Sequence, residues 1–196
     1  MKLIIIGASG HGKVIADLAL LNGYDDIVFV DDDHDAAECA GFPVVGKSTE
    51  APEGEVFVAV GNAGARKQLM ERYKDRKLPA LIHPSAVVAQ DAVIGEGSAV
   101  MAGAVINPGA RLGRGVIVNT SSSVDHDCVI GDYVHVSVGA HLCGTVFVGD
   151  ETWIGAGATV SNNVKICGGC MIGAGAVIIR DISEKGTYVG VPARKN

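Results

Sequence analysis

Large aliphatic residues recur at every sixth position through the C-terminal part of the chain. From Val88 to Ile178 each sixth residue is Ile, Leu or Val, and a small or β-branched residue follows four positions after nearly every one of them. A period of six matches neither the period of an α-helix nor the alternation of a strand. It is typical of a parallel β-helix, in which each hexad supplies one short strand and one turn. We expect three hexads to form one triangular coil of about 18 residues, with the aliphatic side chains stacked inside.

The first part of the chain follows a different pattern of apolar runs. An apolar strand at residues 2–6 is followed by a glycine-rich loop and by a segment whose apolar residues have helical spacing. Two more apolar runs, residues 27–30 and 56–60, end at polar or glycine residues. This order predicts a Rossmann-like βαβ unit with a parallel sheet. The expected class is therefore α/β plus all-β, with a βαβ domain at residues 1–82 and a β-helix with a C-terminal cap at residues 83–196.

The glycine-rich loop predicts a phosphate-binding turn. Gly7, Gly10 and Gly12 stand where the first strand gives way to the helix, and the N–H groups at a helix N-terminus favour a phosphate. Asp31 follows about 20 residues later, where a carboxylate can accept hydrogen bonds from a ribose or a base. The spacing differs from that of NAD sites, and the domain is too short for a second mononucleotide-binding half. We expect a single nucleotide, such as a nucleotide-sugar; the alternative is that the glycines only permit a tight turn.

Composition excludes several classes of partner. The chain has 16 Lys and Arg against 22 Asp and Glu with no basic block, which argues against nucleic acid or an anionic membrane surface. No segment resembles a transmembrane span or a signal peptide, and an odd number of cysteines, five, indicates a reducing compartment. We therefore expect a cytoplasmic protein. Cys167 and Cys170 form a C-x-x-C without a second pair at zinc-site spacing, so no metal is expected.

The residues with catalytic potential lie in the β-helix segment. His126 is flanked by Asp125 and Asp127, and a carboxylate hydrogen-bonded to one imidazole nitrogen raises the basicity of the other. The cluster predicts a general base; the alternative is an exposed histidine with acidic neighbours. His135 and Trp153 are one coil apart and should stack on each other. Histidines on a β-helix also permit a metal site like that of the γ-carbonic anhydrases, but the flanking carboxylates have no role in such a site.

Segments spread over nearly the whole chain resemble the bacterial PglD/NeuD-type nucleotide-sugar acetyltransferases. They are residues 7–12, 30–32, 61–62, 82–86, 119–132 and 190–194. The resemblance implies a left-handed β-helix and an acetyl-CoA-dependent enzyme that acetylates the 4-amino group of a UDP-4-amino-4,6-dideoxy-N-acetyl sugar on the way to UDP-N,N'-diacetylbacillosamine. It also implies a homotrimer and no metal cofactor. The alternatives are acetylation of a GDP-amino-sugar, O-acetylation of the sialic acid type, and a non-catalytic nucleotide-sugar-binding protein.

The same resemblance implies roles for individual residues. His126 matches the catalytic base, and Asp127 matches the acidic residue that raises the pKa of that base. The family has a longer Glu at this position, so either Asp127 or Asp125 could support His126. The implied reaction is a direct transfer without a covalent acyl-enzyme. The implied acetyl-CoA contacts are His135, Ala156 and Ala174, and the implied sugar-nucleotide contacts are Ser9, Gly10, His11, Asp31, Asp32, Gly61 and Asn119.

Overall fold

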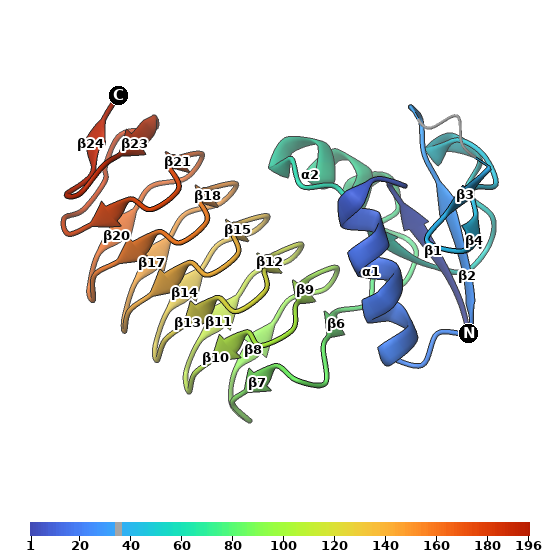
Figure 1. Ribbon diagram of the computed structural model, residues 1–196, viewed down its shortest axis with the longest axis horizontal. Helices are drawn as coiled ribbons and strands as arrows, with labels where there is room; N and C mark the ends of the chain where they lie inside the picture. The colour runs from blue at the N-terminus through green and yellow to red at the C-terminus, as the bar shows by residue number, and fades with distance from the viewer. Residues whose placement is uncertain (34–36) are drawn as a thin grey trace.

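The computed structural model describes residues 1–33 and 37–196 and contains an N-terminal α/β domain beside a long parallel β-helix (Figure 1). Three strands of the N-terminal domain form a parallel sheet in the order β2-β1-β5. Their bounds are β1 (Lys2–Ile6), β2 (Asp26–Val30) and β5 (Glu55–Val58). Helix α1 (Gly10–Leu21) joins β1 to β2, and helix α2 (Ala63–Arg72) follows β5. The predicted βαβ unit is confirmed.

A short hairpin and one helical turn complete this domain. The hairpin consists of β3 (Glu38–Cys39) and β4 (Phe42–Pro43), and a 3-10 turn covers Ser48–Glu50. The central sheet is buried on both faces. Successive side chains of a strand point to opposite sides, so alternate residues contribute to different apolar clusters. Leu3 and Ile5 of β1 pack in one apolar cluster with α1, while Ile4 and Ile6 pack in another with Met70 of α2.

The rest of the chain is built from two-residue strands, each followed by a turn. They are β6 (Leu81–Ile82), β7 (Val87–Val88), β8 (Val93–Ile94), β9 (Ala99–Val100), β10 (Val105–Ile106), β11 (Arg111–Leu112), β12 (Ile117–Val118), β13 (Ser123–Val124), β14 (Val129–Ile130), β15 (His135–Val136), β16 (His141–Leu142), β17 (Phe147–Val148), β18 (Trp153–Ile154), β19 (Thr159–Val160), β20 (Lys165–Ile166), β21 (Met171–Ile172) and β22 (Val177–Ile178). The second residue of each strand points inward and is buried from Val100 onward. The hexad pattern therefore gives the strand and core positions correctly.

Every third strand pairs in parallel, so the β-helix has three faces. The first face contains β7, β10, β13, β16, β19 and β22; the second contains β8, β11, β14, β17 and β20; the third contains β6, β9, β12, β15, β18 and β21. Paired residues such as Ser123 and His141 are 18 positions apart. This register confirms the predicted coil of three hexads.

The third face connects the two domains. Leu81, Ala99 and Ile117 point outward from successive coils of this face, and they are buried in the same apolar cluster as Ile15 and Leu18 of α1. Farther along, α2 reaches toward the β-helix at the level of β12 to β18 (Figure 1). The N-terminal domain thus covers the first coils of the third face, whereas the outward positions of later coils border a cavity described below.

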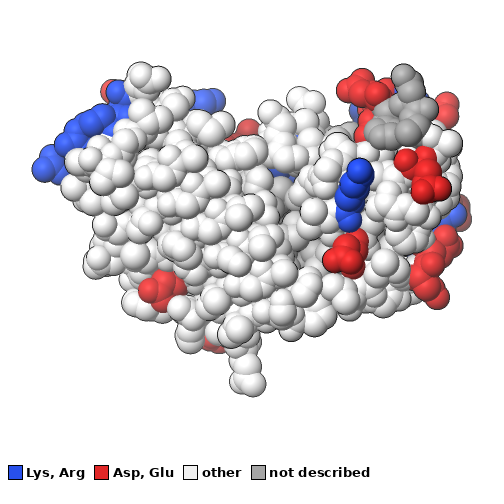
Figure 2. Space-filling model, in the orientation of Figure 1, with Lys and Arg blue, Asp and Glu red and all other residues white. Residues whose placement is uncertain are grey.

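The C-terminal end closes the third face with β23 (Thr187–Val189) and β24 (Arg194–Lys195), of which β24 runs antiparallel to β23. Lys and Arg side chains gather near this end, while the face of the β-helix in view carries few charged side chains (Figure 2). No helix in residues 1–33 and 37–196 is long and apolar enough to cross a lipid bilayer.

Candidate active site

A cleft of about 390 Å³ lies at the carboxyl ends of β1, β2 and β5. Ser9, Asp31, Asp32 and Gly61 line it, as the strand-end positions predicted. The two carboxylates also hold the walls together. Asp31 accepts a hydrogen bond from the N–H group of Ala8 at 2.6 Å and another from the N–H group of Asp33 at 2.9 Å. Both carboxylate oxygens of Asp31 therefore accept hydrogen bonds from the backbone of the cleft itself.

Asp32 forms the opposite wall of this cleft with Ser48. Its carboxylate accepts hydrogen bonds from the Ser48 N–H at 2.8 Å and from the Ser48 hydroxyl at 2.7 Å. These hydrogen bonds hold the pKa of Asp32 below its usual range, so the group is anionic at neutral pH. Sequence reasoning marked Asp31 and Asp32 as ligand contacts and missed that both carboxylates first order the loops of the protein.

The glycines of the first loop differ in what they do. A Cβ on Gly12 would lie 2.1 Å from the carbonyl oxygen of Gly7, so Gly12 is required for close packing of loop and helix. A Cβ on Gly10 would meet no atom within 4 Å, so Gly10 borders open space at the start of α1. Ser9 immediately precedes the helix, and its hydroxyl makes no capping hydrogen bond. Ser9 and Gly10 are therefore the exposed members of the loop, and Ser9 lines the cleft together with Gly7.

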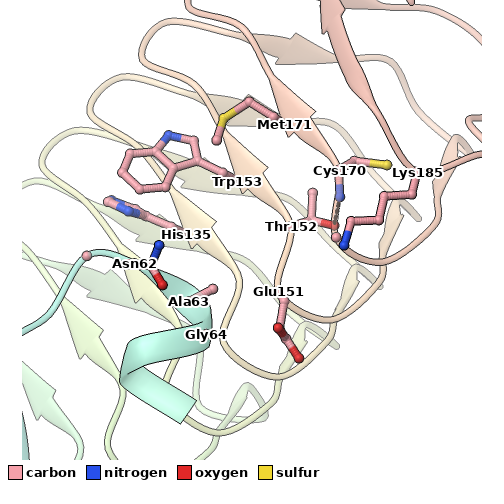
Figure 3. A pocket seen from close by; sticks show the side chains of 12 residues that line it. Asn62, Ala63, Gly64, His135, Glu151, Thr152, Trp153, Cys170, Met171 and Lys185 are labelled. Atoms are coloured by element: carbon pink, nitrogen blue, oxygen red, sulfur yellow. Dashed lines mark hydrogen bonds between the residues drawn. The ribbon is translucent and has the colours of Figure 1, made fainter. Parts of the chain in front are cut away.

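A second cavity, of about 330 Å³, lies between the first turn of α2 and the third face of the β-helix. Asn62 and Gly64 line it on the α2 side, and His135, Trp153 and Met171 line it on the other (Figure 3). Gly61 lines both cavities. The two cavities therefore adjoin at Gly61.

His135 is buried in the wall of the second cavity with only 7% of its surface exposed. Its ring centroid lies 4.4 Å from that of Trp153, which confirms the predicted stacking. Its Nε2 lies 3.1 Å from the Asn119 side-chain amide nitrogen, and its Nδ1 has no hydrogen-bond partner in the described part of the chain. Burial, with help from the charges of Arg66 and His11, lowers the pKa of His135 to about 3. The imidazole is therefore neutral at neutral pH, with one ring nitrogen paired to Asn119 and the other buried.

His11 brings the N-terminal domain close to His135. Burial and the charge of Arg66 lower the pKa of His11 to about 4, and its Nε2 is buried without a partner among the described residues. Because His11 also contributes to the lowered pKa of His135, the two imidazoles lie near each other across the domain boundary. Two neutral histidines with unused ring nitrogens therefore stand between the two domains.

His126 lies on the corner between the first and second faces, between β13 and β14, and its side chain is 57% exposed. Its Nδ1 is 2.9 Å from Asp127 Oδ2. Asp125 instead accepts hydrogen bonds from the His126 backbone N–H at 2.8 Å and from the Asn107 amide at 2.7 Å. The hydrogen bond to Asp127, and secondarily the charge of Asp125, raise the pKa of His126. In this geometry Asp127 contacts the ring and Asp125 orders the turn.

Two glycines on neighbouring coils make room for the histidine–aspartate pair. A Cβ on Gly144 would lie 2.4 Å from His126 Nε2, and a Cβ on Gly109 would lie 2.6 Å from Asp127 Oδ1. Asp127 itself has a left-handed backbone with φ of 57°. The pair therefore lies flat along the corner, in contact with the backbone of adjacent coils and open to solvent.

Comparisons with known proteins agree with this architecture. Residues 2–73 match the family model described as PglD N-terminal domain, and residues 145–180 match the model of the bacterial transferase hexapeptide (six repeats). The chain is 46% identical to the acetyltransferase domain of PglB from Neisseria gonorrhoeae, whose structure was solved in complex with acetyl coenzyme A. The two structures superpose with a TM-score of 0.94 over 100% of this chain and 98% of that one. The chain belongs to the PglD-like sugar N-acetyltransferases.

Two further relatives differ in the nucleotide that their names imply. A structure of PerB from Caulobacter crescentus, in complex with CoA and GDP-perosamine, shares 36% identity and a TM-score of 0.94 over 100% of this chain and 97% of that one. The UDP-N-acetylbacillosamine N-acetyltransferase of Bacillus subtilis is 41% identical over 114 residues, which cover 52% of this chain and 51% of that protein. The alignment thus spans about half the length of that relative.

In this PglD-like chain the candidate base and the two cavities lie on opposite sides of the β-helix. His126 lies on the corner between the first and second faces, whereas His135, Trp153 and Gly61 border the third face. The structure therefore brings Ser9, Asp31, Asp32 and Gly61 together around the first cleft and His135 with Asn119 beside the second cavity. It does not bring His126 to either cavity within one chain, nor do His126, His135 and His141 converge as a metal site would require.

Ala156 and Ala174 are exposed on the corner between the third and first faces. They lie one coil apart, and the Gly175 N–H donates to the Ala156 carbonyl at 2.8 Å. Both side chains are small, so this corner carries no bulky group at these two positions. Spacing alone correctly placed them on one edge of successive coils.

The PglD-like chain has one buried residue at the domain boundary that sequence reasoning missed. Arg66 of α2 is 1% exposed and donates to four backbone carbonyls. Nη1 donates to Val60 and Gly61 of the N-terminal domain, both at 2.8 Å, while Nε and Nη2 donate to Gly115 at 2.8 Å and Tyr133 at 2.6 Å in the β-helix. No pattern in the sequence distinguishes Arg66 from its exposed charged neighbours on α2.

Proposed function

We propose that this protein transfers the acetyl group of acetyl-CoA to the 4-amino group of a UDP-4-amino-4,6-dideoxy-N-acetyl sugar. The observation that carries the proposal is the His126–Asp127 pair, a histidine of raised pKa on a rigid corner with its Nε2 free of other partners among the described residues. The family, the acetyl coenzyme A complex of the PglB domain and the Bacillus subtilis relative support the donor and the acceptor.

The sugar nucleotide and the cofactor occupy separate places in this proposal. Ser9, Gly10 and His11 contact the diphosphate, Asp31 and Asp32 contact the nucleoside, and Gly61 and Asn119 contact the sugar as it enters the second cavity. Acetyl-CoA lies along the corner of Ala156 and Ala174, with its thioester at His135. The neutral His135 ring can donate a hydrogen bond to the thioester oxygen as negative charge develops there.

The reaction is a direct transfer in which His126 acts as general base. Its Nε2 takes a proton from the amine as the nitrogen attacks the thioester carbonyl. The new C–N bond forms, the C–S bond breaks, and the proton passes from His126 to the departing CoA sulfur. Asp127 stabilises the imidazolium that exists between these two proton transfers. Since both substrates are held in place, a general base needs to contribute only about 100- to 10,000-fold to the rate.

A second copy of the chain must supply the base, because His126 and the cavities lie on opposite sides of one β-helix. A closed threefold ring places the His126 corner of each copy beside the third face of its neighbour. The few charged side chains on the β-helix face seen in Figure 2 suit such packing. We therefore propose a homotrimer with three equivalent sites, each formed by two chains.

Thiol release from acetyl-CoA, measured over a panel of UDP- and GDP-linked amino-sugars, tests the reaction and the choice of nucleotide. We expect His126→Ala to lower kcat by at least about 100-fold with little change in acetyl-CoA affinity. His141→Ala is the matched control because His141 is also an exposed histidine of the β-helix, hydrogen-bonded to Ser123 at 2.9 Å. Near-normal turnover by His126→Ala would remove it from the mechanism.

Mixed trimers test the sharing of the site between chains. His126→Ala loses the base and Gly10→Val loses the nucleotide cleft, so each homotrimer is inactive. In a mixed trimer some sites combine an intact base from one chain with an intact cleft from the other, and activity returns. If both parts of the site belonged to a single chain, mixing would restore no activity.

A further inference from the structure

Trp153 occupies the outward position of the third face where the N-terminal domain ceases to cover it. Earlier positions of the same column, Ala99 and Ile117, are buried against α1. His135 follows on the next coil, and then Trp153 and Met171 border the second cavity. Met171 is 44% exposed and Trp153 is half-buried. An apolar surface is therefore left open in the wall of a cavity, where a ligand rather than the protein can cover it.

The six-membered ring of Trp153 lies close to Gly61 in the wall of the second cavity. A Cβ built on Gly61 would come within 3.9 Å of the indole Cη2, and Gly61 is the residue that lines both cavities. A ligand anchored by a nucleotide in the first cleft therefore meets the indole as it extends past Gly61. The His135 ring packs against the indole, with 4.4 Å between the two ring centroids and 47° between the ring planes (Figure 3). This contact limits the freedom of the indole to turn away.

We infer that Trp153 is the platform on which the sugar ring of the substrate lies. The inference rests on the proposed function and adds to it the residue that recognises the sugar. A pyranose ring has an apolar C–H face that covers an indole well, while its hydroxyl and amide groups remain free for hydrogen bonds. The cavity offers partners for such hydrogen bonds, because the charged side chains of Glu151 and Lys185 also line it. The corner of Ala156 and Ala174 is left for the pantetheine arm.

Trp153 is the single tryptophan of the chain, so its fluorescence reports on this cavity alone. We expect a UDP-4-amino-4,6-dideoxy sugar to change the tryptophan emission on binding, and UDP to leave it nearly unchanged although calorimetry shows that UDP binds. Equal responses to UDP and to the sugar nucleotide would contradict the platform. An emission change with acetyl-CoA and none with the sugar nucleotide would assign the cavity to the cofactor and also overturn the platform.

Substitution tests the contribution of the ring to affinity. We expect Trp153→Leu to weaken the binding of the UDP-amino-sugar by about tenfold or more while UDP affinity stays the same, and Trp153→Phe to retain most of the sugar affinity. Phe147→Leu is the control, because Phe147 is an exposed aromatic residue on the second face, away from the cavity. Thermal unfolding checks that each variant is folded.

The outcomes separate the platform from the proposed function. If wild-type protein binds and acetylates the sugar nucleotide and Trp153→Leu does so with unchanged affinity, the platform is wrong and the function stands. If wild-type protein neither binds nor acetylates any sugar nucleotide, the function is wrong and the platform falls with it. The platform is supported if Trp153→Leu weakens the binding of the UDP-amino-sugar but not of UDP, while Trp153→Phe and Phe147→Leu retain the affinity for the sugar nucleotide.

Discussion

Replacing Arg66 by methionine should weaken the attachment of the N-terminal domain to the β-helix. Arg66 is 1% exposed and donates four hydrogen bonds of 2.6 to 2.8 Å, two to each domain. A methionine side chain fills similar space but leaves four buried carbonyls without this donor. Among residues 1–33 and 37–196 no carboxylate forms an ion pair with the guanidinium, so the backbone carbonyls carry its stabilising contacts.

The size of the effect follows from these contacts. A hydrogen bond from a charged donor contributes roughly 1.5 to 3 kcal/mol, and burial of the guanidinium, which lowers its pKa to about 10, offsets part of the sum. We expect Arg66→Met to lower the free energy of unfolding by about 3 to 5 kcal/mol. For a chain of this length that corresponds to a fall in Tm of roughly 6 to 20 °C.

Thermal unfolding followed by circular dichroism measures this fall. The matched control is Arg76→Met, because Arg76 also donates to backbone carbonyls, those of Pro52 and Gly54 at 2.6 and 2.9 Å, but does so nearer the surface and within one domain. We expect the control to lower Tm by less than half as much. If Arg66→Met unfolds at the same temperature as Arg76→Met, the four hydrogen bonds do not hold the domains together.

Three further predictions concern the reaction. Asp127→Asn should move the acidic limb of the kcat/KM profile to lower pH. Loss of the carboxylate lowers the pKa of His126, so the neutral base persists in more acidic solution. An unmoved limb would assign the raised pKa to another group. Gly10→Val should abolish binding of the UDP-sugar in calorimetry while acetyl-CoA still binds, since the new side chain enters open space at the cleft, and loss of both ligands would show that the sites are not separable. Ala174→Tyr should raise KM for acetyl-CoA by about tenfold or more and leave KM for the sugar nucleotide near its original value; an unchanged acetyl-CoA KM would place the cofactor on another corner.

Much of the fold could be predicted because the β-helix repeats one local rule. Once a coil has 18 residues, spacing alone places His135 against Trp153 and Ala156 below Ala174. The same arithmetic separates His126 from His135, since nine residues are half of a coil and therefore bring the chain to the opposite side. The position of a residue around the prism thus follows directly from its number in the sequence.

The contacts between the two domains could not be predicted in this way. Arg66 lies among charged and small residues of α2, and only the tertiary arrangement shows that it faces four carbonyls, two from the turn after β5 and one from each of two turns of the β-helix. Asp31 and Asp32 were recognised by their place at a strand end, but their hydrogen bonds to Ala8 and Ser48 depend on loops whose paths no periodic pattern specifies. Local rules identify strands and corners, whereas burial of a polar group depends on what packs against it.

The reversal of chain direction at β24 also limits how β-helices of this kind can associate. Parallel two-residue strands expose unpaired N–H and C=O groups at the end of a stack, and another molecule could add its own first coil there and extend the stack without limit. On the third face β24 is the outermost strand, and it runs antiparallel to the strand before it. A parallel coil in the 18-residue register has no matching edge at that position. On this face the antiparallel last strand thus disfavours end-to-end stacking of one β-helix on another, which leaves the sides of the prism, with their corners and cavities, for association.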